Sequence, residues 1–251
     1  MIFSPLEQFH LIPLLPLRLG SLDFSLTHST LMMLLGIFAF FGLLRMLTLD
    51  KGGYLVPSRW QVFVEGIYDL CLGLVNDSIH GGKGQAYFPM VFALFAFVMV
   101  CNVTGMVPYS FTSTSHLSVT LGLAMLVFVG YHIICVRKHG IRLLELYYPS
   151  GVSLALAPLI VPIELLAACS RVISLSVRLF ANMMAGHTLL KVIVGFAWQM
   201  MAGGSLLFFA HIVTLGVLTL LIALEFAVAF VQAYVFAVLT CIYLNDAENL
   251  H

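Results

Sequence analysis

The chain has 251 residues, of which 61% are hydrophobic and 9% are charged, and its mean hydropathy is +1.07. This composition lies far outside the range of soluble globular domains and indicates an integral membrane protein. The 11 basic residues balance the 11 acidic residues. The basic excess that non-specific nucleic-acid binding needs is therefore absent, and we expect no nucleic-acid partner.

The first third of the chain predicts a tail, a span and a surface helix. Residues 1–29 hold three prolines and mixed polarity, which is typical of a tail near the membrane interface. Residues 30–47 form an apolar run that is just long enough to cross a bilayer. Over residues 57–80, apolar side chains recur at helical spacing opposite three acidic ones, which predicts an amphipathic helix on the membrane surface. An ordinary linker helix is the alternative interpretation.

The middle of the chain predicts a two-span hairpin over residues 87–136. No Asp, Glu, Lys or Arg occurs between Gly84 and Val136, and a polar segment that starts near Asn102 interrupts the apolar sequence. The basic residues of the loops after the first span, before the second and after the third are Arg45, Lys51, Arg59, Lys83, Arg137, Lys138 and Arg142. By the positive-inside rule these loops share the inner side of the membrane.

The last part of the chain, residues 151–245, predicts a long helical hairpin with its turn at Gly203-Gly204, followed by a C-terminal tail over residues 246–251. The charged part of its first arm alone would be roughly 40 Å long, against a hydrocarbon core of about 30 Å, so the arms must tilt strongly or break. The whole chain therefore predicts an all-α integral membrane protein. We expect a single membrane domain with about five membrane-embedded helices and one amphipathic interfacial helix.

The cysteines and histidines show no spacing that indicates a cofactor site. The five cysteines are scattered singly through apolar sequence without a C-x-x-C pair, which favours buried thiols over disulfides or a zinc site. The nine histidines have no repeated spacing on facing spans that would indicate a haem, and an H-E-x-x-H motif is absent. We expect neither a metal nor a cofactor.

Three charged residues lie in the apolar sequence of the first arm, where each would be costly in hydrocarbon. Glu164, Arg171 and Arg178 are separated by seven residues each time, so they project from one face of a helix. Arg178 stays protonated and cannot relay protons, but it can keep a partner's carboxylate ionised and block proton leakage. The alternative is a structural salt bridge between Arg178 and an acidic residue, Glu164 or Glu225. Glu164 lies about 21 Å away along the same helix and cannot reach Arg178, which leaves Glu225. The small residues around Arg178, which would let another helix approach closely, are Ser174, Ser176, Ala181, Ala185 and Gly186.

The two arms also predict a proton relay. Glu225 and Gln232 share one face of the second arm, and counting from the turn brings His187 of the first arm within one or two helical turns of Glu225. A carboxylate and an imidazole side by side in a low dielectric can exchange protons near neutral pH. The alternative is an interhelical hydrogen bond without proton transfer, and Asn182 and Gln232 could equally be interhelical polar contacts.

These residues resemble a known family. The pattern E-x6-R-x6-R-L-F-A-N-M-M-A-G-H-T over residues 164–188, and E-x6-Q-A-Y-V-F from Glu225 onward, closely resemble subunit a of the F-type ATP synthase, whose mitochondrial form is known as subunit six. The block N-V-T-G-M-V-P-Y-S-F-T-S-T-S-H-L and the opening S-P-L-E-Q-F resemble the plant and algal mitochondrial forms in particular. The resemblance covers nearly the whole chain.

The resemblance implies a proton-translocating stator subunit of a rotary ATP synthase, with inlet and outlet half-channels that load and unload protons on the carboxylates of a rotor c-ring. The implied roles are separation of the half-channels for Arg178, the inlet for Asn182, His187, Glu225 and Gln232, the outlet for Glu164 and Ser174, and a supporting cation for Arg171. The subunit would not be catalytic itself, since the chain has no nucleotide site.

The implied partners are the c-ring, the peripheral stalk, the other membrane subunits and the lipid bilayer. The implied location is the mitochondrial inner membrane, ahead of a bacterial plasma membrane. A stand-alone proton-coupled secondary transporter is the alternative function. Such a transporter would predict two similar halves, and residues 30–140 and 150–245 do not resemble each other.

Overall fold

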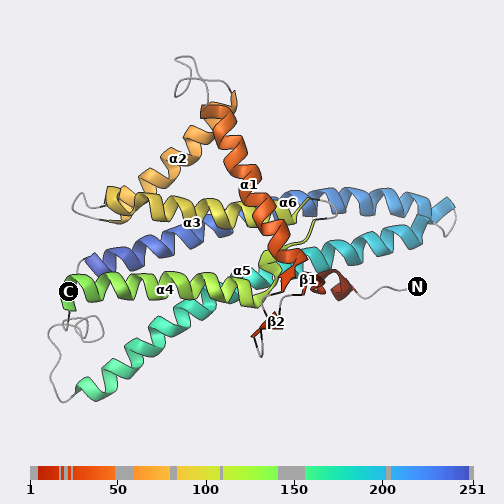
Figure 1. Ribbon diagram of the computed structural model, residues 1–251. Coiled ribbons are helices and arrows are strands. Elements are labelled where there is room, and N and C mark those ends of the chain that lie inside the picture. The colour runs from red at the N-terminus through yellow and green to blue at the C-terminus, as the bar shows by residue number, and fades with distance from the viewer. Residues whose placement is uncertain are drawn as a thin grey trace. The chain divides into compact units, whose positions relative to one another are not determined.

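The computed structural model describes residues 5–16, 18–19, 22–23, 25–48, 59–79, 84–107, 110–140, 156–201 and 205–248. In chain order its elements are η1 (Pro5–Phe9), β1 (Pro13–Leu15), β2 (Arg18–Leu19), β3 (Leu22–Asp23), β4 (Leu26–Thr27), α1 (His28–Thr48), α2 (Arg59–Ser78), α3 (Gly84–Gly105), η2 (Ser113–Ser115), α4 (Leu117–His139), α5 (Ala157–Met201) and α6 (Ser205–Glu248) (Figure 1). Five helices in this described part, all except α2, are long and apolar enough to cross a membrane. The predicted all-α, multi-span membrane architecture is confirmed.

The chain divides into two compact units. The first unit comprises Met1–Phe41, Val98–His116 and Leu179–Gln232, and the second comprises Gly42–Phe97, Leu117–Arg178 and Ala233–His251. The long helices α5 and α6 therefore contribute residues to both units.

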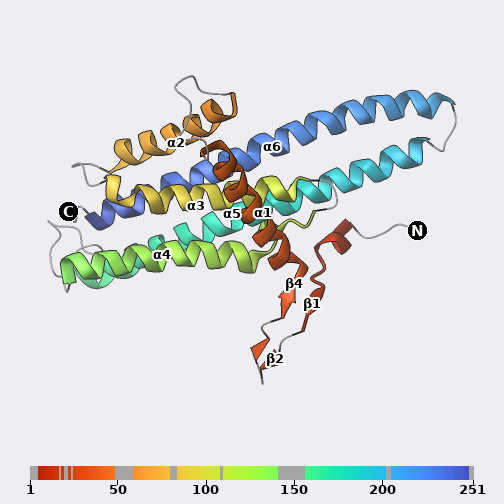
Figure 2. The same cartoon turned by 45° about the horizontal axis from the view of Figure 1, so that its top comes forward.

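In the first unit, short strands precede α1. β1 pairs antiparallel with β4, and β2 with β3 (Figure 2). Helix α1 follows β4 directly, and the Thr27 hydroxyl accepts a hydrogen bond from the backbone N–H of Thr30 at 3.5 Å. This bond satisfies one of the N–H groups that a helix start leaves without a partner. The segment that the sequence predicted only as a tail thus holds local structure of its own.

The two long helices do not break. Helix α5 has 45 residues and α6 has 44, and Pro162 lies in the second turn of α5 without ending it. A helix of this length measures about 67 Å, more than twice the hydrocarbon core of about 30 Å, so we expect both helices to tilt. The predicted turn at Gly203-Gly204 lies outside the described residues, as do the basic loop residues Lys51, Lys83 and Arg142.

Near their connection, α5 and α6 run side by side in opposite directions in both views (Figures 1 and 2). The His211 imidazole donates from Nδ1 to the carbonyl oxygen of Ala197 at 2.8 Å, and the Thr214 hydroxyl lies 3.6 Å from the sulfur of Met200. This hydrogen bond joins α6 to the last turns of α5. This gives His211 a structural role.

In the second unit, α2 packs one face against α3. Cys71, Leu74 and Val75 of α2 are buried, and the Tyr68 ring meets the Phe88 ring of α3 edge-on, with 4.7 Å between centroids. Burial of one apolar face of α2 agrees with the amphipathic pattern that the sequence predicted. Burial also raises the pKa of the Cys71 thiol to about 11, so this thiol stays protonated and unreactive.

The C-terminal end of α6 is tied to two other helices of the second unit. His139 of α4 donates from Nε2 to the carbonyl oxygen of Ala247 at 3.1 Å. The buried Glu248 carboxylate pairs with the ammonium of Lys138 and accepts a hydrogen bond from the Tyr87 hydroxyl of α3. With these contacts α6 continues to Glu248, past residue 245, where the sequence predicted its end.

All five cysteines are free thiols. Cys71, Cys101, Cys135 and Cys241 are buried, as predicted, whereas Cys169 on α5 is exposed. The expectation of a buried thiol is wrong for Cys169 because, within the described residues, no other element covers that side of α5, where the neighbouring Leu165 and Leu166 are exposed as well.

Candidate functional site

The first unit brings a carboxylate of α6 and an imidazole of α5 together. Nε2 of His187 lies 3.7 Å from Oε1 of Glu225. Both side chains are largely removed from solvent, with 16% of the His187 side chain and 8% of the Glu225 side chain exposed. Both oxygens of the Glu225 carboxylate are buried and, among the described residues, neither has a hydrogen-bond partner, so each keeps lone pairs that can accept a proton. The proximity that the hairpin count predicted is present.

Gly186 makes room for the Glu225 carboxylate. A Cβ atom on this glycine would lie 2.6 Å from Oε1 and 3.0 Å from Cδ of Glu225, closer than non-bonded atoms approach. The sequence indicated only that small residues occur here. The structure shows that the carboxylate occupies the space that a side chain at Gly186 would fill.

A second polar contact joins the same two helices. The Asn182 side chain donates from Nδ2 to Oε1 of Gln232 at 3.2 Å, and Gln232 is buried, with 3% of its surface exposed. The four residues that the sequence grouped into one inlet therefore lie as two interhelical pairs of the first unit, His187 with Glu225 and Asn182 with Gln232.

Two polar residues of the first unit touch this site and were not assigned to it from the sequence. Asn102, near the end of α3, is fully buried and donates from Nδ2 to the carbonyl oxygen of Ala229, which lies on α6 between Glu225 and Gln232. The Thr112 hydroxyl, in the segment after α3, lies 2.9 Å from Nε2 of His187. The sequence showed both as parts of a polar interruption, and no spacing signal connects that interruption to the hairpin.

In the second unit, Glu164 and Arg171 form a pair. Nη2 of Arg171 donates to Oε1 of Glu164 at 3.4 Å, and both side chains are more than 40% exposed. The Arg171 guanidinium also lies 5.9 Å from the centre of the Tyr243 ring of α6, a distance at which a cation–π attraction acts. The implied outlet acid and supporting cation are therefore direct neighbours on α5.

Arg178 is exposed on α5 and, within the part of the chain that the structure describes, has no hydrogen bond or ion pair. Ser174 is exposed on the same helix, whereas Ser176 is buried and lies 3.4 Å from the Thr120 hydroxyl of α4. Of the small residues around Arg178, Ser176 is therefore buried against α4, whereas Ser174, Ala181 and Ala185 are exposed.

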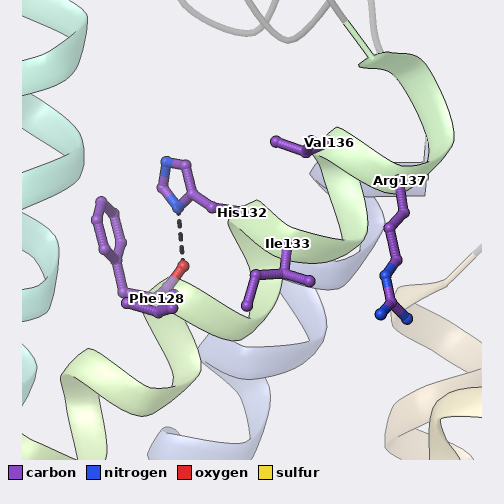
Figure 3. A pocket seen from close by; sticks show the side chains of 6 residues that line it. Phe128, His132, Ile133, Val136 and Arg137 are labelled. Atoms are coloured by element: carbon purple, nitrogen blue, oxygen red, sulfur yellow. Dashed lines mark hydrogen bonds between the residues drawn. The ribbon is translucent and has the colours of Figure 1, made fainter.

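Two hollows lie on helix faces. One, of about 600 Å³, follows α5 in the first unit and is lined by Phe180, Ala181, Met184, Ala185, Thr188, Leu189 and Val192. The other, of about 390 Å³, follows α4 in the second unit between Phe128 and Arg137. Figure 3 shows that His132 in the second hollow already donates from Nδ1 to the carbonyl oxygen of Phe128, at 2.8 Å. Its other lining residues are mostly apolar, so this hollow offers little chemistry for proton transfer.

No group of three His, Cys, Asp or Glu side chains suited to a metal ion occurs among the described residues. The five candidate spans in the described residues define the class, a multi-span membrane protein. Between two of these spans the structure encloses a carboxylate and an imidazole, groups that can exchange protons.

Comparison with known proteins gives the same class. The profile of the family described as ATP synthase A chain matches residues 29–245. The chain is 51% identical over 248 residues to ATP synthase subunit a of Pylaiella littoralis, covering 99% of each chain. It is 49% identical over 250 residues to that of Marchantia polymorpha, again covering 99% of each chain, and 45% identical over 251 residues to that of Chondrus crispus, covering 100% of this chain and 98% of the relative.

The chain belongs to the ATP synthase A chain family, the proton-translocating stator subunit of ATP synthase. The resemblance stated from the motifs is confirmed. The stand-alone transporter finds no support in these comparisons, and the chain works together with other subunits of the ATP synthase.

Proposed function

We propose that the two interhelical pairs of the first unit form the inlet half-channel of this stator subunit. Protons would pass the His187–Glu225 pair and the Asn182–Gln232 pair and load onto a carboxylate of the rotor c-ring. The enclosure of Glu225 beside His187 carries this proposal, since both carboxylate oxygens are buried and have no hydrogen-bond partner among the described residues. An imidazole and a carboxylate at this separation can pass a proton directly after a small approach or through one water molecule.

Arg178 is proposed to separate the two half-channels. A guanidinium cannot give up its proton under physiological conditions, and that of Arg178 has no acidic partner among the described residues. It is therefore available to a carboxylate of another subunit. Such a carboxylate would be held ionised while it passes, which prevents protons from crossing directly between inlet and outlet.

The outlet is proposed at Glu164 and Ser174, with Arg171 as its supporting cation. The Arg171 guanidinium donates a hydrogen bond to the Glu164 carboxylate, so a cation lies beside the acid that is proposed to receive a proton released from the ring. The basic loop residues, which include Arg45, Arg59, Arg137 and Lys138, support an outlet on the inner side by the positive-inside rule.

The partners proposed in detail are the c-ring and the peripheral stalk, and the proposed location is the mitochondrial inner membrane. Each elementary charge that crosses a membrane gains about 2.3 kcal/mol per 100 mV. Since this is far less than the free energy of making one ATP, several protons must cross for each ATP. The chain has no nucleotide motif, so the catalytic step takes place on other subunits.

Replacing Arg178 tests this function. Arg178→Ala should abolish proton-coupled ATP synthesis in membranes while the complex still assembles, because nothing then holds the ring carboxylate ionised or blocks the leak. Arg137→Ala is the matched control: this arginine is also exposed, at the end of α4, and its loss should leave coupling within about twofold. Preserved ATP synthesis in the Arg178→Ala complex would contradict the proposed role.

A further inference from the structure

Thr112 lies in the first unit, in the segment between α3 and α4. Its backbone is extended, with φ −84° and ψ 99°, and it is the residue before the short helix η2. A threonine at such a position commonly uses its hydroxyl to cap the helix, but the Thr112 side chain makes no capping bond. The hydroxyl instead lies 2.9 Å from Nε2 of His187 and donates to the carbonyl oxygen of Gly105 at 3.2 Å.

Contacts on both sides of Thr112 hold its hydroxyl in place. The Ser113 hydroxyl donates to the carbonyl oxygen of Ser29 at 3.0 Å. The Phe111 ring lies 5.5 Å from the imidazole of His28 and 5.3 Å from that of His116. Burial lowers the pKa of His116, so this neighbour stays neutral near pH 7 and adds no charge. Packing, together with these bonds, therefore fixes the hydroxyl next to His187.

Gly105 allows this placement. A Cβ atom on Gly105 would lie 2.6 Å from Cγ2 and 2.8 Å from Oγ1 of Thr112. Only a residue without a side chain lets the Thr112 side chain approach the end of α3 closely enough to use the Gly105 carbonyl oxygen.

Counting hydrogens links the proton on His187 to the direction of the Thr112 hydroxyl. A carbonyl oxygen only accepts, and a hydroxyl has one hydrogen. When that hydrogen is donated to Gly105, the Thr112 oxygen can only accept from Nε2 of His187, so Nε2 carries a proton. The same Nε2 is the atom that lies 3.7 Å from the Glu225 carboxylate. While the hydroxyl donates to Gly105, a protonated Nε2 therefore lies next to both the Thr112 oxygen and the Glu225 carboxylate.

We propose that Thr112 is a positioning residue for proton transfer from His187 to Glu225, holding Nε2 of the imidazole towards the carboxylate in both protonation states of the ring. The inference rests on the proposed inlet and adds to it the residue that orients the imidazole. The sequence motif alone does not indicate this role.

The transfer balances as follows. The imidazolium of His187 carries protons on both ring nitrogens. Its Nε2–H leaves the hydrogen bond with the Thr112 oxygen and turns to Oε1 of Glu225; the Nε2–H bond then breaks as an O–H bond forms on Oε1. The carboxylate becomes a neutral acid, and the ring becomes neutral imidazole with its proton on Nδ1. Nε2 then holds a lone pair, and the Thr112 hydroxyl turns from the Gly105 carbonyl oxygen to donate to it. The 3.7 Å separation closes by about 0.5–1 Å to reach hydrogen-bond distance, or one water molecule bridges it.

Three variants in the assembled ATP synthase test the proposal. Thr112→Val keeps the shape and removes the hydroxyl, and it should lower proton-driven ATP synthesis about tenfold, the value of a hydrogen bond to an ionised group. Thr112→Ser should restore most of the rate. Thr104→Val is the control, since the Thr104 hydroxyl donates only to Val100 and Cys101 of its own helix, and it should stay within about twofold of the unmodified complex.

The readouts separate positioning from stability and from the wider function. A purely structural role would lower the amount of assembled complex, and equal rates for Thr112→Val and Thr112→Ser at equal assembly would overturn the proposal. If Thr112→Val does not assemble, Thr112→Cys offers a weaker donor of similar size; it should be slower than Thr112→Ser, and an equal rate again overturns the proposal. Intact coupling in His187→Ala would instead contradict the proposed inlet itself.

Discussion

At the scale of single residues, the site depends on where side chains are missing as much as on where they are present. The Glu225 carboxylate fills the space that Gly186 leaves empty, and the Thr112 side chain fills the space beside Gly105. In both places a polar group reaches its neighbour because the facing residue has no Cβ. Close approach of this kind lets a carboxylate be enclosed between two helices without widening their separation.

Gly186→Ala should therefore displace the Glu225 carboxylate. The added Cβ would lie 2.6 Å from Oε1, so the carboxylate must move away from its place beside His187. We expect proton-coupled ATP synthesis to fall by about tenfold, because a shift of about 1 Å at a reacting group can cost up to about a hundredfold. Gly195→Ala on the same helix is the matched control, since a Cβ there meets no atom within 4 Å. Equal ATP synthesis rates in the two variants would contradict this view of Gly186.

Single residues also show what the sequence can predict. The His187–Glu225 proximity was predicted because both residues lie on helices joined by one turn. Counting residues from that turn gives the position of each along the hairpin axis. Asn102 and Thr112 could not be found in this way, because packing of the first unit brings them to the hairpin from a distant segment. Thr112, for example, lies 75 residues before His187 in the sequence. The Glu164–Arg171 contact lay within reach of the sequence, because seven residues separate them on one helix face and arginine is long.

At the scale of elements, hydropathy predicts the existence and type of each helix, and tertiary contacts decide where some of them end. The apolar runs and the charges beside them gave the spans, since crossing a bilayer demands apolar length. The end of α6 depends on partners in α3 and α4 that are distant in sequence. The apolar sequence could likewise not show whether α5 and α6 break, and both continue without interruption.

The anchor at the end of α6 can be tested by removing one charge. Lys138→Ala leaves the buried Glu248 carboxylate without its cation, and a hydrogen bond to a charged group is worth about 1.5–3 kcal/mol. In the detergent-solubilised complex, we expect this subunit to become sensitive to protease at a temperature several degrees lower than in the unmodified complex. Arg137→Ala, which removes the neighbouring exposed cation, should change that temperature little. If both variants behave alike, the pair with Glu248 does not anchor the helix.

At the scale of the whole molecule, the described residues contain the proposed inlet and outlet acids but no acidic side chain that contacts Arg178 between them. Its proposed inlet acid is enclosed beside an imidazole in the first unit, and its proposed outlet acid is paired with Arg171 in the second. The described residues offer Arg178 no carboxylate. Large apolar side chains are exposed along α1, α4, α5 and α6, as expected where lipid or other membrane subunits cover a helix. The proposed roles of these residues therefore predict that a carboxylate of a partner subunit carries protons from the inlet to the outlet.

The purified chain, reconstituted alone into liposomes, should not conduct protons. With a potassium diffusion potential imposed, a pH-sensitive dye inside the liposomes should report the same flux as in empty liposomes, because a permanent cation at Arg178 opposes proton passage and no carboxylate moves past it. A protonophore added at the end confirms that the potential was present, and the complete ATP synthase membrane sector serves as the positive control. Flux from the chain alone that Glu225→Gln abolishes would show that it conducts without a ring, which would contradict the requirement for a rotor carboxylate.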